Sequence, residues 1–298
     1  MSVFVLGAIH WDVVVDAPRL PRLGETLPGT GVDYRFGGKG GNQAVAAARM
    51  GARVALAGCV GRDDAGRSCL AALDAAGVDR SRVRTTRTPT GMSVAITEAA
   101  GDYGAVIVSC ANLENDGRDA PPDDCSICLI QNEIPETANL ELCRSLPSGC
   151  RLILNAAPAR PLHDDLAARV NILIANAGEA ESLTGLADPV EAACALRARG
   201  IGTVIVTLGA EGVLLMEDGT LHRAPAQSVP VVSTHGAGDM FTGALAAELA
   251  QGSDTGSALG AAQSAAAQLV SLPISERATF DPAKARENRP SSPPFVER

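Results

Sequence analysis

The run Val232-Ser233-Thr234-His235-Gly236-Ala237-Gly238-Asp239-Met240-Phe241-Thr242-Gly243-Ala244-Leu245 decides which fold is expected of this chain. We expect a short apolar strand, Val229 to Val232, to lead into Gly236-Ala237-Gly238, after which an alanine-rich helix begins. Small residues at such a junction let a ligand approach the backbone closely, and the free N–H groups of the helix start favour an anion. Asp239 falls in the first turn, where a carboxylate either stabilises the helix or acts as a general base beside the anion.

A second glycine run opens another helix of small residues, Phe36-Gly37-Gly38-Lys39-Gly40-Gly41-Asn42-Gln43-Ala44, which continues to Ala52. Together the two runs resemble the PfkB or ribokinase-like family of carbohydrate kinases, whose motifs read GGKGxNQAxAxAxLG and DTxGAGDxFxG. The resemblance is specific in order, spacing and composition, and it extends more loosely over residues 3 to 272.

The resemblance implies ATP-dependent phosphorylation of a hydroxymethyl group on a sugar or a nucleoside. Asp239 would take the proton of the attacking hydroxyl in that reaction. The N–H groups of Gly236, Ala237 and Gly238 would hold the charge of the transferring phosphoryl group, which is an electrostatic role of large weight in such sites.

Length and composition agree with an enzyme of this kind. The chain has 298 residues, of which 46% are hydrophobic and 20% are charged, so it can bury a full core. Its net charge of −9 argues against nonspecific binding to nucleic acid or to an anionic membrane. No apolar run approaches about 20 residues, and no signal-peptide pattern is visible, so we expect a cytoplasmic protein.

Cysteines are frequent for a protein expected in that compartment. Eight are present, and Cys125-Ser126-Ile127-Cys128 has the CxxC spacing without a second pair that would complete a zinc site. We expect buried, reduced thiols that pack in strands and helices rather than a metal or redox site.

Strands and helices alternate along most of the sequence. Such alternation predicts a mainly parallel sheet covered on both faces, with ligands at the carboxyl ends of the strands. The resemblance implies the ribokinase-like three-layer α/β/α fold, in a single domain over residues 1–280 with a C-terminal tail at 281–298. The expected strands span 3–9, 54–60, 126–131, 152–155, 172–175 and 203–207, and the expected helices span 64–76, 135–144, 189–199 and 254–271.

Two segments stand apart from the alternation, at about residues 12–35 and 91–109. Met92, Val94 and Ile96 alternate with small or polar residues, which predicts a strand with one covered face. The resemblance implies that these segments form a small β-sheet lid over the sugar, which would exclude water from the reaction. It also implies a homodimer through the apolar outer face of the lid.

The sugar site is expected from residues at the ends of strands and in the first glycine run. Asp12 follows the first strand, and its carboxylate can accept hydrogen bonds from neighbouring hydroxyls. His10 stands where the family has asparagine, so it either contacts the substrate or has a local structural role, and the adjacent Trp11 either packs or stacks on a substrate ring. The resemblance adds to the substrate site Gly38, Lys39, Asn42 and Glu133.

The nucleotide site is expected at later strand ends. Asn176 and Glu179 match the family's N-x-x-E motif, which positions the Mg²⁺ of ATP largely through water, although the same pattern also occurs as a helix N-cap with a first-turn acid. The resemblance implies that the nucleotide lies over Thr207, Gly209 and Gly212. Looser candidates for the adenine pocket are Gln263 and Ala266.

One departure from the family concerns a monovalent cation. The family has Asp two residues before the position of His235, where it helps to bind an activating cation, and this chain has Ser233. Losing a formal charge weakens a site that must exchange water for protein oxygens, so we expect activity nearly independent of K⁺.

The other departure, His10, bears on the choice of substrate. An imidazole in place of an amide, beside Trp11, makes ribose itself less certain and leaves a nucleoside as the alternative to a sugar. A non-catalytic sugar- or nucleotide-binding protein on the same fold is a third possibility. The intact Gly-Ala-Gly-Asp run argues against it, because a sensor does not need a base.

Overall fold

A large central sheet organises the protein. The computed structural model describes residues 2–98, 103–282 and 296–297, and ten strands of this described part form the sheet, in the order β14-β13-β12-β11-β10-β9-β8-β1-β4-β5. Seven of the strands are mutually parallel, as expected: β1 (Ser2–Leu6), β4 (Val54–Gly61), β5 (Asp79–Thr86), β8 (Cys125–Gln131), β9 (Arg151–Asn155), β10 (Ile172–Asn176) and β11 (Thr203–Thr207).

One edge of the sheet is antiparallel, which the sequence did not predict. After β11 come β12 (Val213–Glu217), β13 (Thr220–Ala224) and β14 (Val296–Glu297), each antiparallel to its neighbour. Only the short turn η2 (Gly209–Glu211) joins β11 to β12, and a parallel crossover needs a connection of a dozen or more residues.

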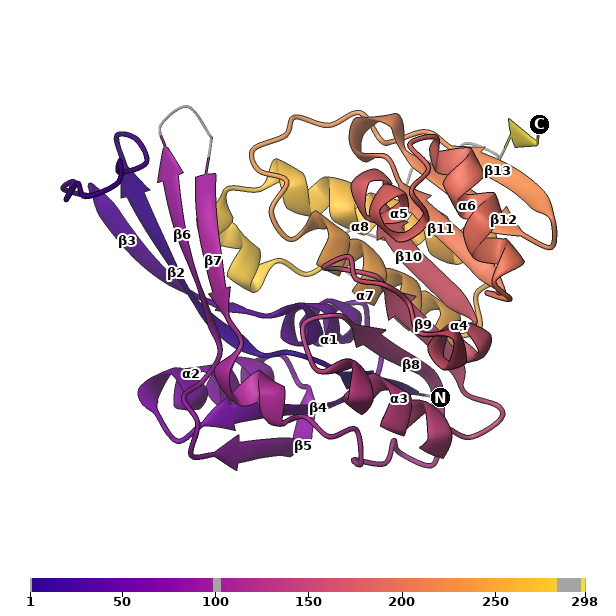
Figure 1. Ribbon diagram of the computed structural model, residues 1–298, viewed down its shortest axis with the longest axis horizontal. Coiled ribbons are helices and arrows are strands. Elements are labelled where there is room, and N and C mark those ends of the chain that lie inside the picture. The colour runs from indigo at the N-terminus through magenta and orange to yellow at the C-terminus, as the bar shows by residue number, and fades with distance from the viewer. Residues whose placement is uncertain (1, 99–102, 283–295, 298) are drawn as a thin grey trace.

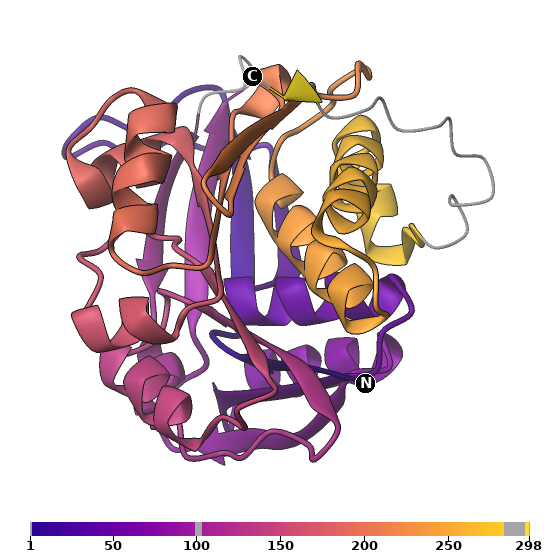
Figure 2. The same ribbon diagram turned by 90° about the vertical axis from the view of Figure 1, so that its right-hand side faces the viewer.

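Helices cover both faces of the sheet, which gives the expected three layers (Figure 2). Each face of the sheet packs against its own helices and forms its own hydrophobic core, because successive side chains of a strand point to opposite faces. In β1, Val3 and Val5 join the core under one helical layer, and Phe4 and Leu6 join the other. The first layer holds α1 (Lys39–Arg49), α2 (Asp64–Ala75), α7 (Ala237–Ala250) and α8 (Thr255–Ser271), and the second holds α3 (Glu136–Ser145), α4 (Asp164–Arg169), α5 (Ala177–Thr184) and α6 (Pro189–Ala198).

A second sheet of four strands projects from the body (Figure 1). Its order is β3-β2-β6-β7, so the two segments expected to form a lid pair through β2 and β6. The bounds are β2 (His10–Ala17), β3 (Gly31–Gly37), β6 (Met92–Glu98) and β7 (Tyr103–Val108), followed by the short helix η1 (Cys110–Glu114). The fold class expected from the sequence is therefore confirmed, including the small sheet.

The expected strand at Val229–Val232 is wrong. The segment between β13 and α7 is a connection outside the sheet, and the N–H of Val232 donates to the carbonyl of Val270 at the end of α8 (2.8 Å). Pro230 lacks the backbone N–H that a strand would donate to its neighbour, and Val231 and Val232 are exposed. The segment therefore neither hydrogen-bonds to the sheet nor packs into the core.

The C-terminal region is described only in part. The short helix η3 (Ile274–Thr279) follows α8, and Val296 and Arg223 are partners in the β13–β14 pair. Most of the expected tail, at residues 283–295 and 298, lies outside the described residues.

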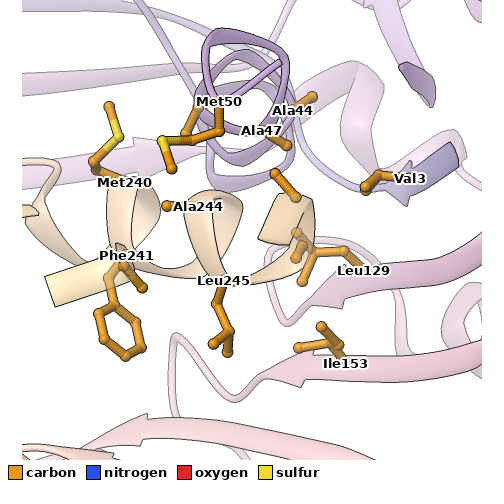
Figure 3. Packing of buried hydrophobic residues seen from close by; sticks show 14 of the residues in the cluster. Val3, Ala44, Ala47, Met50, Leu129, Ile153, Met240, Phe241, Ala244 and Leu245 are labelled. Atoms are coloured by element: carbon orange, nitrogen blue, oxygen red, sulfur yellow. The ribbon is translucent and has the colours of Figure 1, made fainter. Parts of the chain in front are cut away.

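Helices α1 and α7 pack against each other over the sheet, and small residues make the approach close (Figure 3). Ala44 and Ala47 of α1 and Ala244 of α7 are fully buried. A Cβ added at Gly243 would lie 2.5 Å from the Gln43 carbonyl oxygen and 2.6 Å from the Ala46 Cβ, so glycine is required for this spacing. The contact brings the first turn of α7 beside the first turn of α1.

The cysteines are free thiols, and most are buried as expected. Cys110 and Cys143 are half-buried, however, and Cys194 on α6 is exposed. Cys125 and Cys150 lie with their Sγ atoms 3.5 Å apart. Among the helices described here, none has the length and apolar character needed to span a bilayer.

Candidate active site

The start of α7 has the backbone geometry expected of an anion site. Gly236 caps the helix with φ of 79°, a left-handed conformation that favours glycine. A Cβ added at Gly238 would meet no atom within 4 Å, so the surface there is open to a ligand. The N–H of Ala237 donates to the Thr234 carbonyl at 3.1 Å, which makes its role as an anion donor conditional on that turn opening.

Asp239 is held by two amide side chains from α1. Asn42 Nδ2 donates to Asp239 Oδ2 at 3.1 Å, and Gln43 Nε2 donates to Asp239 Oδ1 at 2.9 Å. Each carboxylate oxygen therefore has its own donor, which fixes the plane of the carboxylate. The two glycine runs of the sequence meet at this point.

Gln43 is itself fixed by a buried network. Its Nε2 also donates to Asn155 Oδ1 at 3.1 Å, and its Oε1 accepts from Gln131 Nε2 at 2.7 Å. Gln43 and Gln131 have no exposed surface. Turning the Gln43 amide would place its oxygen against both Asp239 and Asn155, so the network admits one orientation.

Lys39 and Glu133 meet at the start of α1. The Lys39 N–H donates to Glu133 Oε2 at 2.7 Å. Burial raises the pKa of Glu133 to about 7, the Lys39 contacts oppose that rise, and the charges of Asp239 and Asp12 add to it. Gly38, the N-cap of α1, has φ of 82°, and a Cβ there would lie 2.6 Å from the Ala8 carbonyl oxygen.

His10 and Asp12 belong to the first strand of the small sheet. Asp12 Oδ1 accepts from the Ser93 N–H at 2.9 Å and lies 3.9 Å from His10 Nδ1. His10 is 2% exposed, and its Nε2 has no hydrogen-bond partner in the described part of the chain. Burial lowers the pKa of His10, Asp12 raises it and Lys39 lowers it, with a net decrease that leaves the imidazole neutral at pH 7.

The Trp11 side chain packs against the core, on the opposite face of the strand from His10 and Asp12. It pairs across the strands with Phe36, and both side chains lie against the core under α1 and α7. Strand alternation places Trp11 on the face opposite His10 and Asp12. Of the two roles open for Trp11 in the sequence, the structure gives packing.

The expected sugar residues thus form one cluster. Asp12 and His10 come from the small sheet, Lys39 and Asn42 from α1, Glu133 from the loop after β8, and Asp239 from α7. Lys39 is hydrogen-bonded to Glu133, and Asn42 to Asp239. His10 lies beside Asp12.

The expected magnesium residues form a helix cap. Asn176 Oδ1 accepts from the Glu179 N–H and Glu179 Oε2 accepts from the Asn176 N–H, both at 2.8 Å, which is a complete capping box for α5. At the carboxyl end of the sheet, Asn176 is exposed and Glu179 is half-buried. The pattern therefore has the local structural role that the sequence left open beside the metal role.

The expected nucleotide residues gather at the neighbouring strand ends. Thr207 is the last residue of β11 and pairs with Asn176. A Cβ at Gly212, which has φ of 101°, would lie 2.1 Å from the Ala224 carbonyl oxygen, and Gly209 also has positive φ. Gln263 Nε2 donates to the carbonyls of Pro225 (3.1 Å) and, more weakly, Ala224 (3.5 Å). Ala266 on the same helix is half-buried.

Several residues that complete the site were not assigned from the sequence. Gln43 lies in the first glycine run and Asn155 ends a predicted strand, so both had a positional signal, but nothing local shows that they meet. Ser93 contributes only its backbone, and Arg277, which contacts the loop before α7, lies in a segment without a motif.

Comparison with known proteins shows the family to which the chain belongs. The family model for the pfkB family carbohydrate kinases matches residues 1–275. The ribokinase of Haemophilus influenzae is 35% identical over 278 residues, which cover 88% of this chain and 90% of that protein. The structure of a ribokinase from Thermotoga maritima superposes with a TM-score of 0.88 at 27% identity, covering 97% of this chain and all of that one.

A further solved relative carries ligands. The ribokinase of Arabidopsis thaliana, whose structure is a complex with ribose and ATP, superposes with a TM-score of 0.82 at 28% identity over 93% of this chain and 97% of that chain. The chain therefore belongs to the pfkB family of carbohydrate kinases. It is a sugar kinase, a phosphotransferase with an alcohol group as acceptor.

Proposed function

We propose that this kinase transfers the γ-phosphoryl group of ATP to a hydroxymethyl group of a small sugar, with ribose as the first candidate. The observation that carries the proposal is the Asp239 carboxylate, held at the start of α7 by Asn42 and Gln43. Support for ribose comes from relatives named ribokinase at 35% and 36% identity and from the ribose complex of a solved relative.

Asp239 is the general base in this proposal. A positioned carboxylate beside a helix N-terminus can take the proton of the attacking hydroxyl while the N–H groups of Gly236 and Gly238 face the developing negative charge. The N–H of Ala237 would join them after leaving the Thr234 carbonyl. Because the amide network already fixes the base, little reorganisation is needed when the substrate is bound.

The sugar would be held by the cluster on the other side of the base. Asp12 and Glu133 offer carboxylate acceptors, and Asn42 and Lys39 offer donors. The unpartnered Nε2 of His10 would gain its hydrogen bond from a sugar hydroxyl, since an unpaired buried nitrogen is costly. These contacts would orient the hydroxymethyl group toward Asp239.

The nucleotide would lie over Thr207, Gly209 and Gly212, with Gln263 beside the adenine. Mg²⁺ would suit the half-buried carboxylate of Glu179, because this ion prefers hard oxygen ligands and keeps several waters, and Asn176 would join it through water. When bound, the ion would neutralise charge on the phosphate oxygens. The capping box would fix the orientation of the Glu179 carboxylate for this contact.

The outer face of the small sheet would bind a second copy of the chain. The strand register aligns Tyr34, Val13, Val94 and Val106 in one apolar row across all four strands. Tyr34 is 57% and Val106 is 66% exposed. The opposite face carries Asp12, so the two faces have separate roles: one toward substrate, the other toward the partner copy.

Production of ADP from Mg·ATP tests the proposal, with ribose, deoxyribose, fructose, other sugars and nucleosides as acceptors and Asp239→Asn as the comparison. We expect turnover on a pentose, a loss of at least about 10³-fold in kcat for the variant, and sugar binding within a few-fold of the original. Turnover confined to a nucleoside would replace the substrate class. Full activity of Asp239→Asn would remove the base assignment.

A further inference from the structure

Three backbone carbonyls converge on one guanidinium next to the start of α7. Arg277, on η3, donates from Nη2 to the Ser233 carbonyl (2.7 Å), from Nη1 to the His235 carbonyl (2.7 Å) and from Nε to the Leu272 carbonyl (3.2 Å). All three nitrogens of the fork are thus used on neutral backbone oxygens, which places the positive charge of the side chain at their meeting point.

The backbone of Arg277 is also fixed. Its own carbonyl accepts from Arg49 Nη1 at 2.9 Å, and Arg49 lies in the last turn of α1. Arg277 therefore joins three parts of the site: the end of α8, the loop before α7 and the helix that carries Asn42 and Gln43. Ser233 and His235 precede Gly236 by three residues and one residue, so holding their carbonyls holds the left-handed glycine that opens α7.

This arrangement does not fit a bare monovalent cation, which the family resemblance implies for the same loop. Ser233 has no formal charge, and its hydroxyl accepts from the His235 N–H at 3.3 Å. Two carbonyls of the loop, which a cation would need as ligands, already accept from Arg277. A guanidinium stays charged at every physiological pH and does not dissociate.

We propose that Arg277 is a positioning residue that takes the place of a dissociable cation, fixing the loop before α7 so that phosphoryl transfer does not depend on K⁺. The proposal rests on the kinase function proposed above. It also predicts that removing the guanidinium creates a site for a small cation, because the three carbonyls would be left without their donor.

The test measures kcat and KM in K⁺, in Na⁺ and in tetramethylammonium at constant ionic strength, for the original protein and for Arg277→Ala and Arg277→Gln. The original should vary by less than about twofold among the salts, and in tetramethylammonium each variant should lose about tenfold or more in kcat. Guanidinium ion at about 10 mM should restore several-fold activity to Arg277→Ala only. Arg169→Ala is the matched control, because Arg169 donates to the Cys150 (2.9 Å) and Pro147 (3.4 Å) carbonyls at the opposite end of the strands.

Strong activation of the original protein by K⁺ would overturn the proposal, as would an Arg277→Ala variant that keeps full activity in tetramethylammonium. Thermal unfolding in the same salts tests the cation site without substrate. It therefore distinguishes failure of this proposal from failure of the proposed kinase function. Relative to tetramethylammonium, K⁺ should raise the melting temperature of Arg277→Ala and Arg277→Gln, and guanidinium ion should raise that of Arg277→Ala only, without either effect on the original or on Arg169→Ala. Equal responses of all four proteins would exclude a cation site at this loop.

Discussion

At the scale of single residues, Gln43 is the side chain on which the geometry of the base depends. Gln43→Glu would set a carboxylate against Asp239, and we expect kcat to fall about 10²-fold with KM little changed, since small displacements of a base have effects of that size. The acid limb of the pH–rate profile should move to higher pH, because a nearby negative charge disfavours ionisation of the base.

The neutral Gln43→Met should lower kcat without moving that limb, which separates charge from positioning. Gln251→Glu, at the other end of α7, is the control for an added carboxylate. An unchanged kcat in Gln43→Glu would show that the base does not need this amide.

The raised pKa of Glu133 predicts how the stability of the protein changes with pH. Burial raises its pKa to about 7 in the folded protein, above the ordinary value of 4.5. Between those values the unfolded chain has released a proton that the folded protein keeps, so stability should fall as pH rises through this window and level off above it.

Chemical denaturation at a series of pH values, compared between the original protein and Glu133→Gln, measures this contribution. The difference in unfolding free energy should change between pH 4.5 and about 7 and be constant outside that window. A difference that does not vary with pH would show that Glu133 ionises normally.

At the scale of elements, the crossing of α1 and α7 sets the position of the base. Gly243 lies one turn after Asp239, and a Cβ there would be 2.5 Å from the Gln43 carbonyl oxygen. Gly243→Ala should therefore separate the helices, lower the unfolding free energy by about 1–3 kcal/mol and reduce kcat as well. Gly149→Ala is a suitable control, because a Cβ at Gly149 meets no atom within 4 Å. Thermal unfolding of both variants measures the effect, and equal melting temperatures would contradict it.

At the scale of the whole molecule, the apolar row on the small sheet predicts a dimer. Val106→Glu places a charge in the proposed contact, and we expect this variant to be monomeric in light scattering at concentrations where the original is a dimer. Leu113→Glu serves as the control, since Leu113 is 62% exposed but lies outside the small sheet on η1. A monomeric original protein would contradict the prediction at once.

The family motifs explain why much of the site could be predicted. Gly38, Asn42 and Asp239 are adjacent to glycine runs whose backbone demands are local, and the structure places them together. The strand at Val229–Val232 failed because its valines fit a strand while the surrounding chain offers no ladder. The antiparallel edge was missed because strand direction depends on the length of the connection and not on residue pattern.

By itself, the sequence determined the fold class and the two helix starts, because periodicity and glycine placement act over a few neighbouring residues, and the resemblance of its two glycine runs to the family motifs implied the reaction type. Tertiary structure alone decided which amides hold Asp239, on which face Trp11 lies, and that Arg277 binds the carbonyls of Ser233 and His235. Those contacts join residues up to 197 positions apart. Only the packing of helices and strands brings such distant residues within hydrogen-bonding distance, so no local pattern records them.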